Sequence, residues 1–287
     1  MSLNRRDFLG RTAALATTTS LIPMAALATS DSIKLGSILD SSGPFDAYGK
    51  PMDQAMRLAV SEINAAGILS ASREAIRQTM RKSKTLYFYN VLYEGGVCDR
   101  NIFINGVTPA QQVEALVPYA MKNSGKKVYI LAADYNYGQF TARWIQKFVA
   151  ENGGEVVGTD FFPLDVSDFG STIAKVQTAA PDLVIAPLVG GAHLSFFRQW
   201  AAAGMKDKIA LASTTLGVGN EHKVLTAAEG NGIMCAYNYS QELDTPENAA
   251  FKEKWAAMYD GDQSMHEIAV SHYHGIMTWA EGVRQAG

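Results

Sequence analysis

Histidine is the residue type in this chain best suited to proton transfer or metal binding, and its five copies are not arranged for either. None of them has an identifiable nucleophile as a partner, and the chain contains no Gly-x-Ser-x-Gly elbow. His272 and His274 stand two residues apart on a predicted helix, so they face different directions and do not make a metal pair. The pattern predicts no catalytic residues and a protein that is not an enzyme.

The two cysteines, Cys98 and Cys235, do not indicate a metal or redox centre either. The sequence has no CxxC, HExxH or His/Cys cluster, so we expect no metal site and no cofactor. An oxidising compartment would permit a disulfide, but one pair so far apart in the sequence favours two free thiols.

Four tyrosines are better candidates for function, because their positions suit ligand binding. Tyr89 and Tyr93 flank a transition from a predicted strand to a loop, and Tyr135 and Tyr137 follow another predicted strand. A tyrosine offers a rigid apolar ring and a hydroxyl that can donate or accept a hydrogen bond. We expect pocket roles for Tyr89 and Tyr135, with packing in the core or at an interface as the alternative for all four.

The elements that must position these side chains alternate short apolar runs with amphipathic helical patterns. This alternation predicts an α/β protein with parallel sheets flanked by helices. The predicted strands are residues 33–39, 86–89, 102–105, 127–132, 155–162, 183–187, 209–213 and 233–237. The predicted helices are residues 51–67, 71–82, 140–150, 172–179, 194–203, 246–259 and 267–285.

Composition narrows the class of protein further. A chain of 287 residues, 47% of them hydrophobic and 18% charged, is long enough for two modest globular domains. A net charge of −3 and a pI near 6.0 argue against nucleic-acid binding, which needs a basic surface.

The N-terminus carries the features of an export signal. Arg5-Arg6-Asp7-Phe8-Leu9 is a twin-arginine pattern, residues 13–26 are moderately apolar, and Ala26-Leu27-Ala28 suits a signal peptidase. An amphipathic terminal helix or a membrane anchor is the alternative, but the apolar stretch is short and is broken by threonines and a proline. We expect residues 1–28 to be a twin-arginine signal peptide and the mature protein to be periplasmic.

The chain resembles the type I periplasmic binding proteins that serve ABC transporters. The resemblance starts with Lys34-Leu35-Gly36-Ser37-Ile38, continues with Ser41-Ser42-Gly43-Pro44, and includes a helix ending in Asn64-Ala65-Ala66-Gly67. It implies two Rossmann-like lobes with the ligand between them. The first lobe would comprise residues 30–107 and 240–287, and the second lobe residues 108–239.

Three further segments are similar to the branch of this family that binds urea and short-chain amides. They are Tyr87-Phe88-Tyr89 running into residues 92–96 (LYEGG), residues 133–137 (ADYNY) and residues 243–248 (LDTPEN). The resemblance implies an exported receptor that delivers a small polar ligand to an ABC permease. The alternatives are a branched-chain amino-acid or other small-solute receptor, an amide-sensing regulator, and an exported amidohydrolase. The sequence does not indicate the oligomeric state.

Family position adds further candidate ligand contacts. Ser70 would offer a hydroxyl and a backbone N–H at the start of a helix, or act only as a helix cap. Val91 stands where some amide binders have a threonine. Gly190 precedes a helix and could present backbone amides, and Thr214 follows a strand. Glu94 could accept amide N–H groups, although an ion pair with an arginine is the favoured role.

The chain departs from the family pattern at two places. Gly67-Ile68-Leu69 runs directly into Ser70, where relatives have another strand, helix and strand, a unit of roughly 40 residues. The sequence also ends at Gly287, where relatives continue. The resemblance therefore predicts an incomplete first lobe.

Overall fold

The computed structural model describes residues 54–56, 77–78, 80–82, 84–219, 221–259 and 265–286. These residues belong to one compact unit, which spans residues 35–287. Outside the described residues lie the signal peptide, the predicted strand at 33–39, Ser70, and most of the two predicted helices at 51–67 and 71–82.

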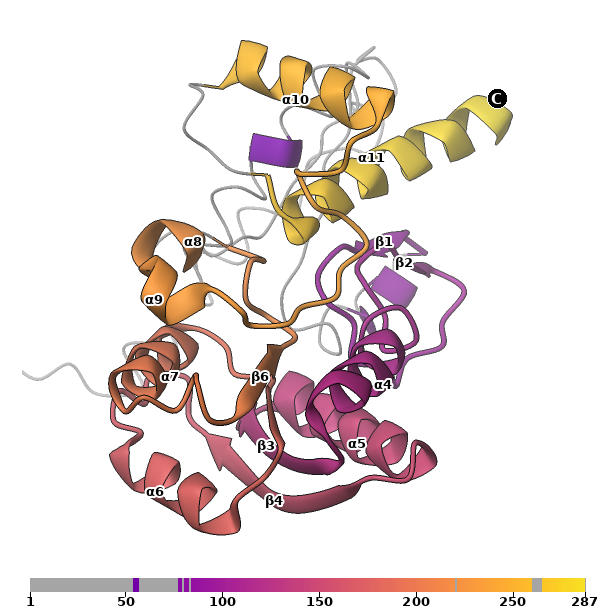
Figure 1. Cartoon of the computed structure of the whole chain (residues 1–287). Helices are drawn as coiled ribbons and strands as arrows, with labels where there is room; N and C mark the ends of the chain where they lie inside the picture. Colours follow the sequence, from indigo (N-terminus) through magenta and orange to yellow (C-terminus); the bar gives the residue numbers. More distant parts are fainter. Residues whose placement is uncertain are drawn as a thin grey trace, which may run out of the picture. The chain divides into compact units, whose positions relative to one another are not determined.

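The larger of the two described sheets is parallel and has four strands (Figure 1). Its strands lie in the order β4-β3-β5-β6, so that β3 and β5 are central and each of them has a partner on both sides. The central strand β5 is buried throughout, as its continuous apolar run predicts. The strands are β3 (Lys127–Ala133), β4 (Glu155–Phe162), β5 (Leu183–Ala186) and β6 (Ala210–Ser213).

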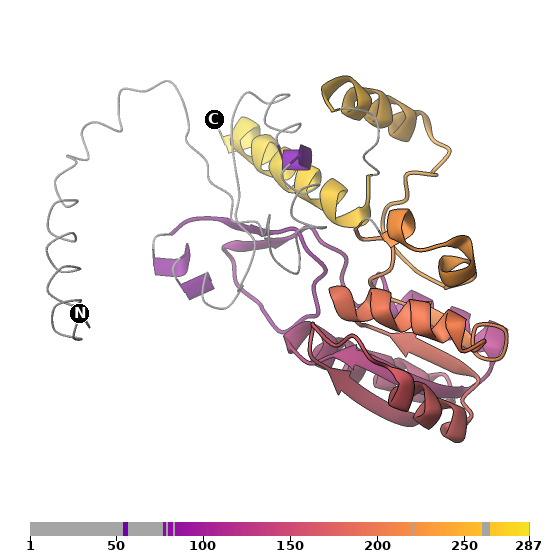
Figure 2. The ribbon, with the colours of Figure 1, turned by 90° about the vertical axis from the view of Figure 1, so that its left-hand side faces the viewer.

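Two pairs of helices cover the two faces of this sheet (Figures 1 and 2). Successive side chains of a strand point to opposite faces. Val128 and Ile130 of β3 therefore pack under α4 and α5, whereas Leu131 packs with Trp200 under α6 and α7. These helices are α4 (Val113–Ser124), α5 (Asn136–Glu151), α6 (Gly170–Ala179) and α7 (Gly191–Ala202).

A second, two-stranded sheet consists of β1 (Tyr87–Tyr89) and β2 (Ile102–Ile104), which are also parallel. The rings of Phe88 and Phe103 stack across this pair, with centroids 4.9 Å apart. Both sheets thus confirm the predicted α/β class. The two-stranded sheet lies within residues 30–107 and the four-stranded sheet within residues 108–239, while the lobe boundaries themselves stay a prediction.

The C-terminal part of the chain is helical. Two short helices, α8 (Glu221–Val224) and α9 (Ala227–Gly230), precede α10 (Pro246–Met258) and α11 (Glu267–Ala286). Helix α10 begins with proline at its first position and with Thr245 as its cap, whose hydroxyl accepts the Asn248 N–H at 3.2 Å. The rings of Phe251 and Tyr273 join α10 to α11, with centroids 4.8 Å apart.

One predicted strand is absent, and one long helix was not predicted. The segment 233–237 is not a strand: Met234 makes a single parallel bridge with Ala212. The backbone ladder ends there, and the Ala236 carbonyl accepts a hydrogen bond from the Gln112 side chain instead. Helix α4 was not predicted, because Pro118 lies inside it and proline is a strong helix breaker.

Candidate functional site

The carboxyl ends of all six described strands meet in one apolar cluster, which we call the strand-end cluster. Each of the strands β1 to β6 contributes at least one residue, which lies at the end of the strand or shortly after it. Ligands of parallel α/β sheets bind at this edge. The members are Val91, Leu92, Val107, Ala133, Tyr137, Leu164, Val189, Val218, Tyr237 and Ile268.

Tyr137 joins this cluster to a buried polar group. It lies in the first turn of α5, is buried, and donates its hydroxyl to Thr214 Oγ1 at 2.9 Å. Burial raises the pKa of Tyr137 well above its ordinary value, with the nearby Glu94 carboxylate adding to the effect and the hydroxyls of Thr214 and Thr141 opposing it. The structure therefore brings together two predicted site residues that are 77 positions apart.

Gln112 fixes Thr214 from the other side. Its side chain is buried, and its amide nitrogen donates to the carbonyl oxygens of Thr214 and Ala236, both at 3.0 Å. Only the amide nitrogen of a glutamine can donate, so two carbonyl partners define its orientation. Sequence reasoning missed Gln112, because nothing in its neighbourhood along the chain reveals partners more than 100 positions away.

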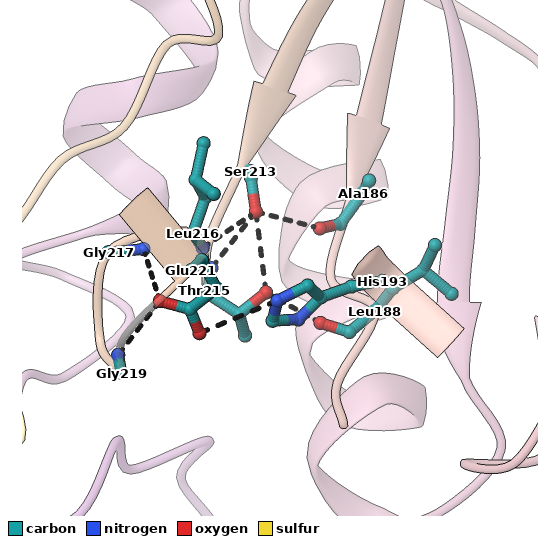
Figure 3. A network of polar contacts seen from close by, with 9 residues as sticks. All are labelled: Ala186, Leu188, His193, Ser213, Thr215, Leu216, Gly217, Gly219 and Glu221. Carbon is teal, nitrogen blue, oxygen red and sulfur yellow. Dashed lines mark hydrogen bonds and ion pairs between the residues drawn. The ribbon is translucent and has the colours of Figure 1, made fainter. Parts of the chain in front are cut away.

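Hydrogen bonds from two hydroxyls join the end of β6 and the segment after it to the end of β5 and the segment after that (Figure 3). Ser213 donates to the Ala186 carbonyl at 3.3 Å, and Thr215 donates to the Leu188 carbonyl at 2.5 Å. The backbone N–H groups of Thr215 and Leu216 donate to Ser213 Oγ in turn. The start of the loop 214–219 is thus fixed by these hydrogen bonds in addition to those from Tyr137 and Gln112 to Thr214.

Gly190 and Tyr135 each stand directly before a helix at the same edge. Gly190 has a φ of 71°, a conformation that favours glycine, and α7 starts at Gly191. A Cβ at Gly191 would meet no atom within 4 Å, so the space beside the first turn of α7 is open. Tyr135 precedes α5 and is 37% exposed, with its ring centroid 6.1 Å from that of Tyr137.

The remaining predicted residues lie on the segment after β1. The Tyr93 hydroxyl donates to the Val97 carbonyl at 2.7 Å and accepts the Val97 N–H at 2.8 Å, so it closes a loop of its own chain. Its ring lies 6.1 Å from that of Tyr89, centroid to centroid. Val91 is one of the partly buried members of the strand-end cluster. The Glu94 carbonyl accepts the indole N–H of Trp144 on α5 at 3.0 Å, which joins this segment to a helix that covers the four-stranded sheet.

The segments after β3 to β6 can form hydrogen bonds with a ligand but offer it no lysine or arginine. In residues 134–135, 163–169, 187–190 and 214–219, the described segments after β3 to β6, there is no lysine or arginine. Among the described residues no group of three His, Cys, Asp or Glu side chains could hold a metal ion. Both cysteines are free and exposed.

A hollow away from this edge does not suit a specific ligand. It has a volume of about 420 Å³ and lies between the end of α5 and the first half of β4. Its lining consists mostly of valine, alanine and glycine with two polar side chains, Gln146 and Thr159. We place the candidate site at the carboxyl ends of the strands, because the convergent polar groups lie there. No helix in the described residues is long and apolar enough to span a membrane.

Comparison with solved structures shows the same architecture. A solute-binding protein of an ABC transporter from R. palustris, in complex with benzoate, has a TM-score of 0.72 and 20% identity over 88% of this chain and 80% of its own. An ABC transporter substrate-binding protein from Sphaerobacter thermophilus has a TM-score of 0.73 and 19% identity, over 88% of this chain and 80% of its own. A periplasmic ligand-binding protein of a branched-chain amino-acid ABC transporter from Burkholderia xenovorans has a TM-score of 0.69 and 16% identity, over 88% of this chain and 78% of its own.

The sequence comparisons identify the family. No curated protein matches the sequence. The profile of the family described as "Periplasmic binding protein domain" matches residues 67–287, most of the chain. The chain belongs to the periplasmic binding proteins, a family of non-enzymatic solute receptors, and it has the type I fold of the solved structures compared above.

Proposed function

We propose that the protein binds urea or a short-chain amide and delivers it to an ABC permease in the inner membrane. The observation that carries the proposal is that the segments after β3 to β6 offer hydrogen-bonding groups but no lysine or arginine. Tyr135 can donate and accept hydrogen bonds, and the backbone amides that begin α7 can donate them. Thr214 is fully buried and bonded by Tyr137 and Gln112, so it would support the site from behind. The segments after β3 to β6 contain no cationic side chain. A neutral ligand with N–H donors and one carbonyl acceptor matches this set.

The lack of cationic side chains in these segments disfavours benzoate and amino acids, the ligand classes named for two of the three solved structures above. Benzoate and amino acids carry a carboxylate, which cationic side chains bind most strongly. An amino acid also needs a carboxylate for its ammonium group. The Glu221 carboxylate at this edge is buried and already accepts the N–H groups of Gly217 and Gly219. A carboxylate ligand would therefore depend on the backbone amides at the start of α7.

Delivery requires that the ligand changes the conformation of its receptor. In the proposed arrangement, residues 30–107 and 240–287 form one lobe, residues 108–239 form the other, and a bound ligand stabilises the closed form by contacting both. Tyr89, Val91 and Ser70 would contribute from the first lobe. Export by the twin-arginine route would bring the folded receptor to the periplasm.

A thermal-shift panel tests the ligand class. We expect urea, formamide, acetamide or propionamide to raise the melting temperature with increasing concentration, because a ligand that binds only the native state stabilises it by about 2.7 kcal/mol at 100 times its Kd. Urea must be kept in the low millimolar range, since it is a denaturant at molar concentration. Leucine and benzoate are the contrasting ligands. A response to leucine or benzoate alone would contradict the proposal and assign the corresponding class instead.

Tyr135 tests the position of the site. We expect Tyr135→Phe to weaken binding of the best ligand of the panel by about 0.5–1.5 kcal/mol, the contribution of one neutral hydrogen bond. Tyr135→Ala should weaken binding further, because it also opens the pocket wall to water. Calorimetric titration measures the affinity, and circular dichroism confirms folding. Tyr119→Ala on α4 is the control, since Tyr119 is 62% exposed. Parent-like affinity in both Tyr135 variants would make Tyr135 a packing residue.

A further inference from the structure

Glu221 closes the outer part of the loop 214–219. It is the first residue of α8, and its side chain is 4% exposed. One carboxylate oxygen, Oε2, accepts the backbone N–H of Gly217 at 3.2 Å and that of Gly219 at 3.0 Å (Figure 3). A carboxylate that accepts two amides of one short loop restricts the loop to the conformation that presents both donors.

The second carboxylate oxygen faces a histidine of α7. Glu221 Oε1 lies 3.4 Å from His193 Nε2, and the His193 side chain is 1% exposed (Figure 3). Burial alone would raise the pKa of Glu221, but His193 and the backbone amides outweigh it, so the pKa lies below its ordinary value and the group is a carboxylate at neutral pH. His193 follows Gly191 by two residues, so the pair connects the loop after β6 to the first turn of α7.

The loop has a separate attachment at its start. Ser213 and Thr215 hold the beginning of the loop against the Ala186 and Leu188 carbonyls, as described above. Gly217, with a φ of 92°, has no Cβ and would be mobile without an acceptor for its N–H. Val218 is held separately, because it is buried in the strand-end cluster and its N–H donates to the Thr215 carbonyl at 3.3 Å. Loss of the Glu221 carboxylate should therefore free the N–H groups of Gly217 and Gly219 and leave the strand ends joined.

We propose that Glu221 is a positioning residue, which holds residues 217–219 in the conformation that borders the ligand, and that His193 keeps its carboxylate in place. The inference rests on the proposed function only in placing the ligand beside this loop. Its first consequence, the order of the loop, is independent of which ligand binds.

Amide hydrogen exchange of the full chain without ligand, followed by NMR, tests the positioning. In Glu221→Ala we expect the amides of Gly217 and Gly219 to exchange at least about tenfold faster, the factor for a hydrogen bond worth about 1.4 kcal/mol. The amides of β3 and β5 should keep their protection. His193→Gln, which retains a side-chain N–H donor, should preserve most of the protection at Gly217 and Gly219.

Glu229→Ala is the matched control. The Glu229 carboxylate also accepts a backbone N–H, that of Thr226 at 2.7 Å, but it caps α9. This variant should leave exchange at Gly217 and Gly219 unchanged. Parent-like exchange of these two amides in Glu221→Ala would overturn the proposal. Equal acceleration in β3 and β5 would also overturn it, because Glu221 would then support the whole fold.

Titration with acetamide adds the functional measurement. Glu221→Ala should bind acetamide at least about tenfold more weakly than the parent, with a melting temperature that changes little. Unchanged affinity together with faster loop exchange would overturn the link to the ligand. If acetamide fails to bind the parent, the proposed ligand class is at fault, and the exchange experiment alone still decides whether Glu221 positions the loop.

Discussion

Replacing Gln112 by leucine is expected to lower the free energy of unfolding by about 2–4 kcal/mol, although the two side chains have similar volumes. The amide of Gln112 is the hydrogen-bond donor to the carbonyls of Thr214 and Ala236. Leucine would leave both carbonyls without this partner, and an unsatisfied buried polar group costs about 1–3 kcal/mol. Thr214 is fully buried, so water cannot replace the lost donor there.

Urea denaturation followed by circular dichroism measures this loss. Gln146→Leu is the control, because Gln146 is exposed on α5 and makes one long hydrogen bond, of 3.4 Å, to Thr159. We expect the control to change stability by less than about 0.5 kcal/mol. If Gln112→Leu were as stable as the parent, the two hydrogen bonds would contribute nothing, and the account of Thr214 as a fixed point of the site would fail.

Alanine in place of Gly138 is expected to lower the free energy of unfolding by about 1–3 kcal/mol, despite the higher helix propensity of alanine. Gly138 is the third residue of α5 and packs directly on the end of β3. A Cβ at this position would lie 2.0 Å from the Ala133 carbonyl oxygen and 2.7 Å from the Ala133 nitrogen. Both are backbone atoms, so the first turn of α5 must move away and take Tyr137 with it.

Thermal unfolding of Gly138→Ala and Gly282→Ala separates this clash from the effect of helix propensity. Gly282 lies in α11, and a Cβ there would meet no atom within 4 Å. Gly282→Ala should stabilise the protein by about 0.5–1 kcal/mol, because alanine is the better helix former. A Gly138→Ala variant that is stabilised to the same extent would show that the helix can move away from β3 without cost.

The sequence by itself determined the α/β class and most of the element positions. Local patterns suffice for this, because a buried strand and an amphipathic helix each have a characteristic apolar period. The strand at 155–162 has the predicted bounds, and α10 and α11 end within one residue of the prediction. The sequence also directed attention to the segments after the strands, where Tyr135, Tyr137, Gly190 and Thr214 stand. Their role in binding stays a prediction.

Only the tertiary structure decided which of these residues meet and what holds them. The hydrogen bonds from Tyr137 and Gln112 to Thr214 span 77 and 102 positions, so no local pattern encodes them. Pro118 disfavours a helix locally, yet α4 forms because its apolar face, with Val117 and Met121, is buried against the sheet. The apolar run at 233–237 suggests a strand, but its pairing ends after one bridge, and the Ala236 carbonyl accepts the Gln112 amide instead. Long-range packing and side-chain hydrogen bonds outweigh local propensity at these positions.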